Sequence, residues 1–306
     1  MSRNNKAIVW LRCLAALLII NSHFGPLYPG RLSALAFGGV FGNCMFFALS
    51  AWCFAEISQP FPSWMAKRLV RLYVPFLIFF SLYAILFSRG ELCLSAFLLP
   101  VRRYHFIASI VTLYPVWYLA AYIHKRARLK YSHMLVIALA VQLLYFYLVL
   151  DYNNYYIYQH YNVFELISYL CVMLLGASLR TEKFIGNRAV LIAMSAVAAL
   201  VYLSMSVFRF PQWLTILRWY SSMAFVYGLS CLMLSMEDTL RECRPVSVIA
   251  DMTLELYLVQ EILISAFQRV LFPVNLLLCT VCIFALAYCL RFVSEKLIRK
   301  INARIG

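Results

Sequence analysis

The 306-residue sequence has few charged residues and very few acidic ones. Charged residues make up 13% of the chain, with 12 Asp and Glu against 27 Lys and Arg, whereas apolar residues make up 64%. A soluble domain is about half apolar and about one quarter charged. The composition therefore excludes an ordinary soluble domain. A nucleic-acid surface needs a soluble basic face, so the net charge of +15 does not indicate one.

The sequence also lacks the patterns of disulfide-rich and metal-binding proteins. Of its ten cysteines, only Cys93 is predicted to lie clearly on the oxidising side of the membrane, so we expect no disulfide framework. The five histidines have no metal-ligand spacing, and they are His23, His105, His124, His133 and His160. We find no internal repeat and no paired interrupted helices of the kind that mark many secondary transporters. We therefore expect neither a structural nor a catalytic metal.

What the sequence does have is apolar blocks of about twenty residues, long enough to cross a hydrocarbon layer of roughly 30 Å as helices. They predict a single all-α domain over residues 1–306, a polytopic transmembrane bundle of about ten spans. The expected spans are residues 7–28, 34–57, 70–88, 105–124, 132–150, 162–180, 189–208, 215–236, 247–271 and 273–294.

The Lys and Arg residues predict the orientation of the bundle. They gather at the N-terminus, at the C-terminus and in every second connection, for example at Lys125, Arg126, Arg128 and Lys130. Cytoplasmic connections carry an excess of such residues. Both termini are therefore predicted to be cytoplasmic, and the basic balance is explained without a nucleic-acid partner.

Ionisable residues inside a span are expensive and indicate function by default. Arg12 and His23 lie eleven residues apart in the first span, which is almost three helical turns. They share one face, roughly 16 Å apart along the axis. Arg12 alone is equally well explained as a snorkelling anchor, but Asn21 and Ser22 beside His23 favour a functional face.

Two further groups of residues are less specific when taken alone. Gly39, Asn43 and Ser50 recur at helical spacing in the second span, a pattern also typical of close helix packing. Arg68 and Arg71 lie one turn apart just before the third span. Two guanidinium groups so spaced can grip a phosphate, although cytoplasmic anchoring explains them as well.

Taken in order, these residues resemble the motifs of acyltransferase family 3, membrane proteins that O-acylate bacterial surface polysaccharides. The family's Arg and His, ten residues between them, fall on Arg12 and His23. Its Phe-Phe-x-x-Ser-Gly motif falls on 46–51, with Ala51 in place of glycine, and its Arg-x-x-Arg motif falls on Arg68 and Arg71.

Two later segments extend the resemblance to nearly the whole chain. Trp117-Tyr118-Leu119 looks like the family's Trp-Phe-Leu segment. Residues 253–260 are similar to a Ser-x-Glu-Ile-Tyr-Leu-x-His segment, with Gln260 at the histidine position. This departure removes an ionisable group, so catalysis through a histidine would depend on His23.

The resemblance implies an O-acetyltransferase of the bacterial inner membrane, with no permanently bound cofactor. Cytoplasmic acetyl-CoA would be the donor, held by Arg68, Arg71 and Arg12. The acceptor would be a sugar hydroxyl of a surface or lipid-linked glycan such as O-antigen, capsule or exopolysaccharide.

His23 would then act as a general base or carry the acyl group. Asn21 and Ser50 are candidates to orient His23 or polarise the acyl carbonyl. Glu255 would be its acidic partner, unless Glu255 and Asp251 form a structural ion pair with Arg12 or a neighbour. Pocket-lining roles are expected for the remaining candidates, which are Asn43, Trp117, Tyr257 and Gln260.

Two other classes of protein fit part of the pattern. A multi-span transporter or flippase for a lipid-linked sugar shares the buried charges, but it does not predict a paired arginine turn on the cytoplasmic face. An inactive relative that serves as a scaffold would show damaged motifs, whereas only Ala51 and Gln260 depart from the family pattern.

The predicted orientation is tested by single cysteines at Asn154 and Arg128 in a cysteine-free background. We expect a membrane-impermeant thiol reagent to label residue 154 in intact cells and residue 128 only after lysis. Labelling of residue 128 in intact cells would overturn the orientation and the cytoplasmic position of the donor.

Overall fold

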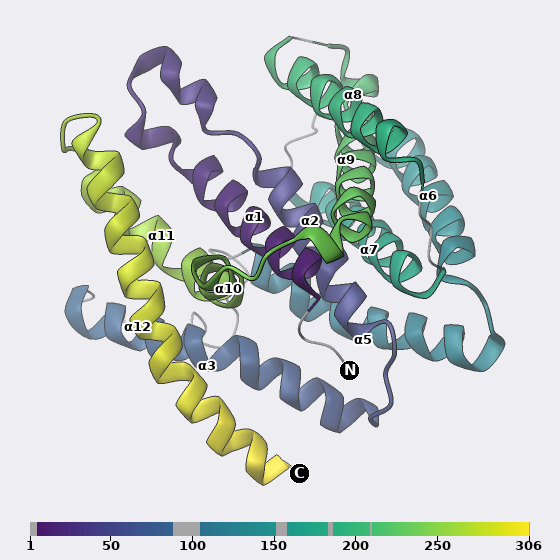
Figure 1. Ribbon diagram of the computed structural model, residues 1–306, viewed down its shortest axis with the longest axis horizontal. Helices are drawn as coiled ribbons and strands as arrows, with labels where there is room; N and C mark the ends of the chain where they lie inside the picture. The colour runs from purple at the N-terminus through teal and green to yellow at the C-terminus, as the bar shows by residue number, and fades with distance from the viewer. Residues whose placement is uncertain (1–4, 88–104, 151–157, 183–185, 209, 306) are drawn as a thin grey trace. The chain divides into compact units, whose positions relative to one another are not determined.

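The computed structural model describes residues 5–87, 105–150, 158–182, 186–208 and 210–305. These residues form eleven α-helices, a few short 3-10 turns and no strand (Figure 1). The prediction of an all-α protein is confirmed. The helices are α1 (Lys6–His23), α2 (Gly39–Phe54), α3 (Phe61–Phe87), α5 (His105–Ala127), α6 (Tyr131–Leu148), α7 (Tyr158–Glu182), α8 (Arg188–Val207), α9 (Ile216–Ser235), α10 (Arg244–Asp251), α11 (Thr253–Phe267) and α12 (Val274–Ile305).

Seven of the helical segments are long and apolar enough to cross a membrane, so the chain is a multi-pass membrane protein. Each of the ten predicted spans contains a helix, but α3, α9 and α11 are not among the seven. α11 has 15 residues, which is about 22 Å of helix against a layer of about 30 Å. The expected number of ten spans and the cytoplasmic termini therefore remain predictions.

The ninth predicted span, residues 247–271, is not one helix. It is divided at Met252 into the short helix α10 and the longer α11. The Met252 N–H still donates to Val248 O at 3.2 Å, and its carbonyl accepts from Leu256 N at 2.9 Å, so the break is a local kink. Pro245 is tolerated because it lies in the first turn of α10, where no intrahelical donor is needed.

The helices gather into two compact units, each built from separate stretches of the chain. The first unit contains residues 1–15, 40–57 and 117–247, and the second contains residues 16–39, 58–116 and 248–306. α1, α2, α5 and α10 each contribute residues to both units. The expectation of one domain over residues 1–306 stays a prediction.

In the first unit, α6 packs on α7 and α8 packs on α9 (Figure 1). Phe41 of α2 lies against Tyr202 of α8 and Phe225 of α9, with ring centroids 4.2 and 4.4 Å apart. A polar contact joins α6 to α7, where Gln142 Nε2 donates to Ser168 Oγ at 2.6 Å. Small residues and aromatic rings thus bring these helices together.

In the second unit, α11 packs against both α3 and α12 (Figure 1). The core is apolar, and Leu256, Leu258 and Val259 of α11 are at most 1% exposed within it. The N-terminal side of this unit turns sharply before α2, where Gly38 has a φ of +101° and faces the Leu18 side chain. A residue with a Cβ is disfavoured there by both strain and contact.

Some of the expected features lie outside the described residues. They are the connection from Arg89 to Tyr104, Cys93 within it, and Asn154.

A glycine in α7 sets the closest approach of α2 and α7 in the first unit. A Cβ added at Gly176 would collide with the backbone of Ala48, which cannot move as a side chain can. We expect Gly176→Ala to lower the free energy of unfolding by about 1–2 kcal/mol. Overpacking costs roughly 1–3 kcal/mol, and the gain of about 1 kcal/mol in helix propensity offsets only part of it.

The measurement is thermal unfolding of the two proteins in the same detergent. Gly186→Ala is the matched control, because a Cβ there would make only ordinary contacts with the Leu191 side chain, the nearest at 3.5 Å. Equal melting temperatures for Gly176→Ala and wild type would contradict the packing described for α2 and α7.

Candidate functional site

His23 is the last residue of α1, and its imidazole is exposed. Its ring meets the ring of Tyr257 on α11 edge-on, with centroids 6.4 Å apart and an interplanar angle of 74°. Tyr257 also contacts Phe106 of α5, and the two ring centroids lie 5.0 Å apart. The structure therefore brings together two predicted site residues, His23 and Tyr257, and leaves the imidazole accessible.

A carboxylate that sequence reasoning did not single out acts on His23. Glu261 interacts electrostatically with the imidazole, and it is exposed. It follows Tyr257 by four residues on α11, so both side chains lie on one face of the helix. The four-residue spacing from Tyr257 is the sequence signal that could have identified Glu261.

Gln260, on the same stretch of α11, is only 1% exposed. Its Oε1 accepts no hydrogen bond from any described residue. A buried acceptor without a donor costs about 1–3 kcal/mol. Gln260 follows Tyr257 by three residues, so the amide lies near the same helical face as the aromatic ring that contacts His23.

The predicted arginine pair lies within α3, which begins earlier than the expected third span. The Arg68 guanidinium carbon lies 5.7 Å from the centroid of the Trp64 ring, within range of a cation–π interaction. Trp64 in turn contacts Tyr114 edge-on at 5.6 Å. The charges of Arg68 and Arg71 both act on Tyr114, and Arg71 is exposed. The two cations thus lie on one side of α3, as predicted.

Glu255, predicted as the acidic partner of His23, is 7% exposed and lies among basic groups. Arg291 of α12 and Arg71 of α3 are the cations that act on its carboxyl group. Arg291 also pairs with Asp251 at 3.1 Å and with Glu295 at 2.7 Å. The ion pair considered for Asp251 is therefore made with Arg291. Glu255 is thus buried near two cations, and its role as the acidic partner of His23 stays a prediction.

Asn21 precedes His23 by two residues, but its amide holds the connection that follows α1. Its Nδ2 donates to Leu35 O at 2.7 Å and to Phe37 O at 3.0 Å. Its Oδ1 accepts from the Tyr28 hydroxyl at 3.3 Å. All three bonds fix the backbone between α1 and α2.

The remaining predicted residues, Arg12, Asn43, Ser50 and Trp117, belong to the first unit. Trp117 is fully buried, stacks on Tyr131 with centroids 5.6 Å apart, and donates to Phe54 O at 3.3 Å. Asn43 Nδ2 donates to the Tyr169 hydroxyl at 3.4 Å. Arg12 and Ser50 are half-buried on α1 and α2, and the site roles of all four residues stay predictions.

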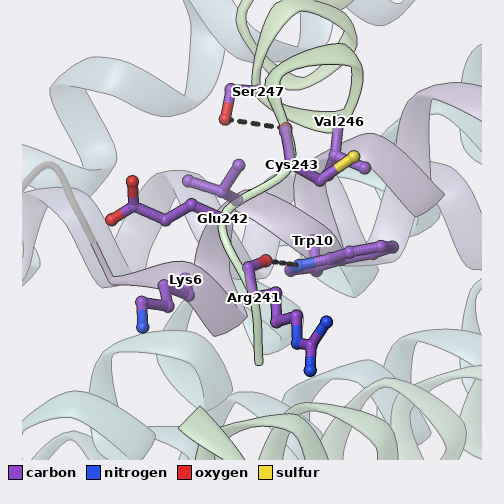
Figure 2. Close-up of a pocket in the computed structure, with 8 residues that line it drawn as sticks. Lys6, Trp10, Arg241, Glu242, Cys243, Val246 and Ser247 are labelled. Carbon is purple, nitrogen blue, oxygen red and sulfur yellow. Dashed lines mark hydrogen bonds between the residues drawn. The ribbon is translucent and has the colours of Figure 1, made fainter. Parts of the chain in front are cut away.

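A cavity of about 130 Å³ in the first unit contains none of the predicted site residues. Figure 2 shows its lining, which comes from the first turns of α1 and from the connection that leads into α10. Lys6, Trp10 and Arg241 are its chemically most distinctive residues. Within the described ranges, no group of three or more His, Cys, Asp or Glu side chains could hold a metal ion.

The profile of the acyltransferase domain of family 3 matches residues 5–294. Searches of curated proteins and of solved structures gave no significant match. The match spans nearly the whole chain and both units, so this protein belongs to acyltransferase family 3. It is an acyltransferase enzyme.

The two carboxylates of α11 should respond differently to loss of charge. Both conceivable roles of His23 pass through a positively charged imidazole, which Glu261 stabilises. We expect Glu261→Gln to lower kcat about tenfold, equivalent to about 1.4 kcal/mol. Glu255→Gln should instead leave kcat nearly unchanged, because the structure describes no contact between Glu255 and His23, and Arg291 keeps its ion pairs with Asp251 and Glu295.

Acyl transfer and thermal unfolding measured on both variants separate these effects. A large loss of turnover in Glu255→Gln at unchanged stability, with an active Glu261→Gln, would return the catalytic role to Glu255.

Proposed function

We propose that this enzyme transfers an acetyl group from cytoplasmic acetyl-CoA to a sugar hydroxyl of a cell-surface or lipid-linked glycan. The observation that carries the proposal is the accessible His23 imidazole, held by the edge of Tyr257 and influenced by the charge of Glu261. Family membership supplies the reaction class. The bacterial inner membrane is the location that this substrate pair requires.

His23 can serve the reaction in two ways. As a general base, it takes the proton of the sugar hydroxyl while the oxygen attacks the thioester carbonyl; the C–O bond forms, the C–S bond breaks, and the proton passes to the departing thiolate. As a nucleophile, its nitrogen attacks the carbonyl carbon, so that an N–C bond forms and the C–S bond breaks with loss of the thiolate. The sugar oxygen then attacks this positively charged acyl-imidazole; the C–O bond forms, the N–C bond breaks, and the hydroxyl proton passes to the thiolate. In both routes the imidazole gains positive charge, for which Glu261 is suited.

Arg68 and Arg71 are the proposed contacts for the phosphates of the donor. A guanidinium group presents donors that match phosphate oxygens two at a time. The Trp64 ring restricts Arg68, so less conformational entropy is lost when a phosphate binds. The exposed Arg71 adds a second cation on the same side of α3. Arg12 is a third proposed donor contact, on α1.

The proposal is tested by steady-state acetyl transfer with purified variants. His23→Ala should reduce turnover by at least about a hundredfold while leaving CoA binding nearly intact. Arg68→Ala and Arg71→Ala should each raise the donor KM about tenfold with little change in kcat, because phosphate contacts are made equally in the ground and transition states. Lysine at either position should restore part of the affinity.

Two substitutions serve as matched controls. His133→Ala removes an exposed imidazole from α6, and Lys67→Ala removes the cation that precedes Arg68 on α3. Both should behave like the wild type. Turnover near the wild-type level in His23→Ala, at equal expression and stability, would refute the proposed mechanism.

A further inference from the structure

The cavity in the first unit lies where the first two turns of α1 meet the connection from η6 (Glu237–Thr239) to α10 (Figure 2). Two side-chain hydrogen bonds fix this connection to the helix. Asn5 Nδ2 donates to Glu237 Oε2 at 2.7 Å, and Trp10 Nε1 donates to Arg241 O at 3.2 Å. Asn5 Oδ1 also accepts from Ile8 N at 3.0 Å and so caps the start of α1. The cavity therefore has walls that are held in place.

The lining combines cations with an apolar wall. Lys6 and Arg241 contribute positive charge, and neither forms an ion pair with any residue that the structure describes. In Figure 2 the Lys6 side chain lies to the left of the connection and the Arg241 side chain to its right, so the two cations stand on either side of it. Glu242 is the single acidic residue of the lining, and its side chain points away from Arg241 (Figure 2). The lining keeps a net charge of +1.

The apolar wall is formed by Val9, Trp10 and Val246. Trp10 lies between Cys243 and the side chain of Arg241 (Figure 2). Its indole N–H is already used on the Arg241 carbonyl, so the ring offers apolar surface, and the cations supply the donors for a ligand. A tryptophan and basic residues at the end of a membrane-spanning helix are typical of the membrane–water interface.

We propose that this cavity binds a phosphate group. Lys6 offers three N–H donors around a compact charge, and Arg241 offers a planar fork that matches two phosphate oxygens. A volume of about 130 Å³ admits one small group, since a cavity of about 150 Å³ holds a benzene molecule. The group is the phosphate of an acidic phospholipid or that of a free nucleotide.

The cavity lining contains none of the residues proposed for donor binding or catalysis, which are Arg12, Arg68, Arg71 and His23. The inference therefore does not depend on the proposed function. Basic pockets beside membrane helices bind acidic headgroups, and each Lys or Arg changes the affinity about fivefold.

The lipid arm of the experiment uses the full-length protein in detergent with mixed phosphatidylglycerol and phosphatidylcholine, and measures retained lipid by native mass spectrometry. The Lys6→Gln/Arg241→Gln double variant should retain phosphatidylglycerol about thirtyfold more weakly, since two cations are lost. Glu242→Gln should retain it more tightly than the wild type. Retention of phosphatidylcholine should not change.

The nucleotide arm measures equilibrium dialysis of inorganic phosphate and of adenosine 3′,5′-bisphosphate without acidic lipid. It is repeated in Arg68→Ala/Arg71→Ala protein, so that binding at that pair is removed. A loss of phosphate or nucleotide binding caused by Lys6→Gln/Arg241→Gln in this background would identify a free phosphate compound as the ligand.

Arg244→Gln is the matched control, because Arg244 is an exposed cation close by in sequence but outside the cavity. Lys6→Arg/Arg241→Lys keeps both charges and should keep most of the binding. If Lys6→Gln/Arg241→Gln weakens binding in one arm and Arg244→Gln does not, the result supports the site, and that arm identifies the source of the ligand. If Lys6→Gln/Arg241→Gln weakens binding in neither arm by more than Arg244→Gln does, at matched melting temperatures, the proposal is overturned. Unchanged binding in Glu242→Gln also counts against it, and that test does not require removal of a cation.

Discussion

A polar group within the hydrocarbon layer has no water to bind, so it must find a partner in the protein. The helices satisfy the backbone. Most of the serines in them satisfy themselves, because their hydroxyls donate to carbonyls one turn earlier; Ser168 donates to Phe164 O at 2.8 Å, and Ser195 to Leu191 O at 2.8 Å. The hydroxyls of these serines are therefore hydrogen-bonded within their own helix and are not free to donate to a substrate.

The residues of interest are those that their own helix does not satisfy. His23 is exposed at a helix end, and the side-chain carbonyl oxygen of Gln260 is buried without a donor in the described part of the chain. Gln260 follows Val259, which is buried in the apolar core of the second unit. The resemblance of residues 253–260 to the family motif predicts a histidine at position 260, where this chain has Gln260, an acceptor that does not titrate.

Aromatic rings fix the positions of several of these polar side chains. Tyr257 contacts His23, Trp64 lies against Arg68, and Trp10 binds the backbone of Arg241. A ring adds large contact area with few rotatable bonds, which suits a site whose helices pack through dispersion instead of a hydrophobic driving force. Other basic residues, such as Arg126 and Arg128, are exposed.

The sequence by itself determined the helical class, the placement of a helix in each predicted segment and the family, because segment hydropathy and motif spacing are properties of the chain alone. His23 and the Arg68–Arg71 pair could also be selected as candidates from the sequence, because the spacing that defines each lies within a single helix. Only the tertiary structure decided that Glu261 acts on His23 while Glu255 lies beside Arg291, and that Asn21 holds a connection. It also decided the division of the ninth segment at Met252 and the cavity at Lys6, Trp10 and Arg241. These features depend on contacts between helices that are distant in sequence, which a periodic pattern along one helix does not encode.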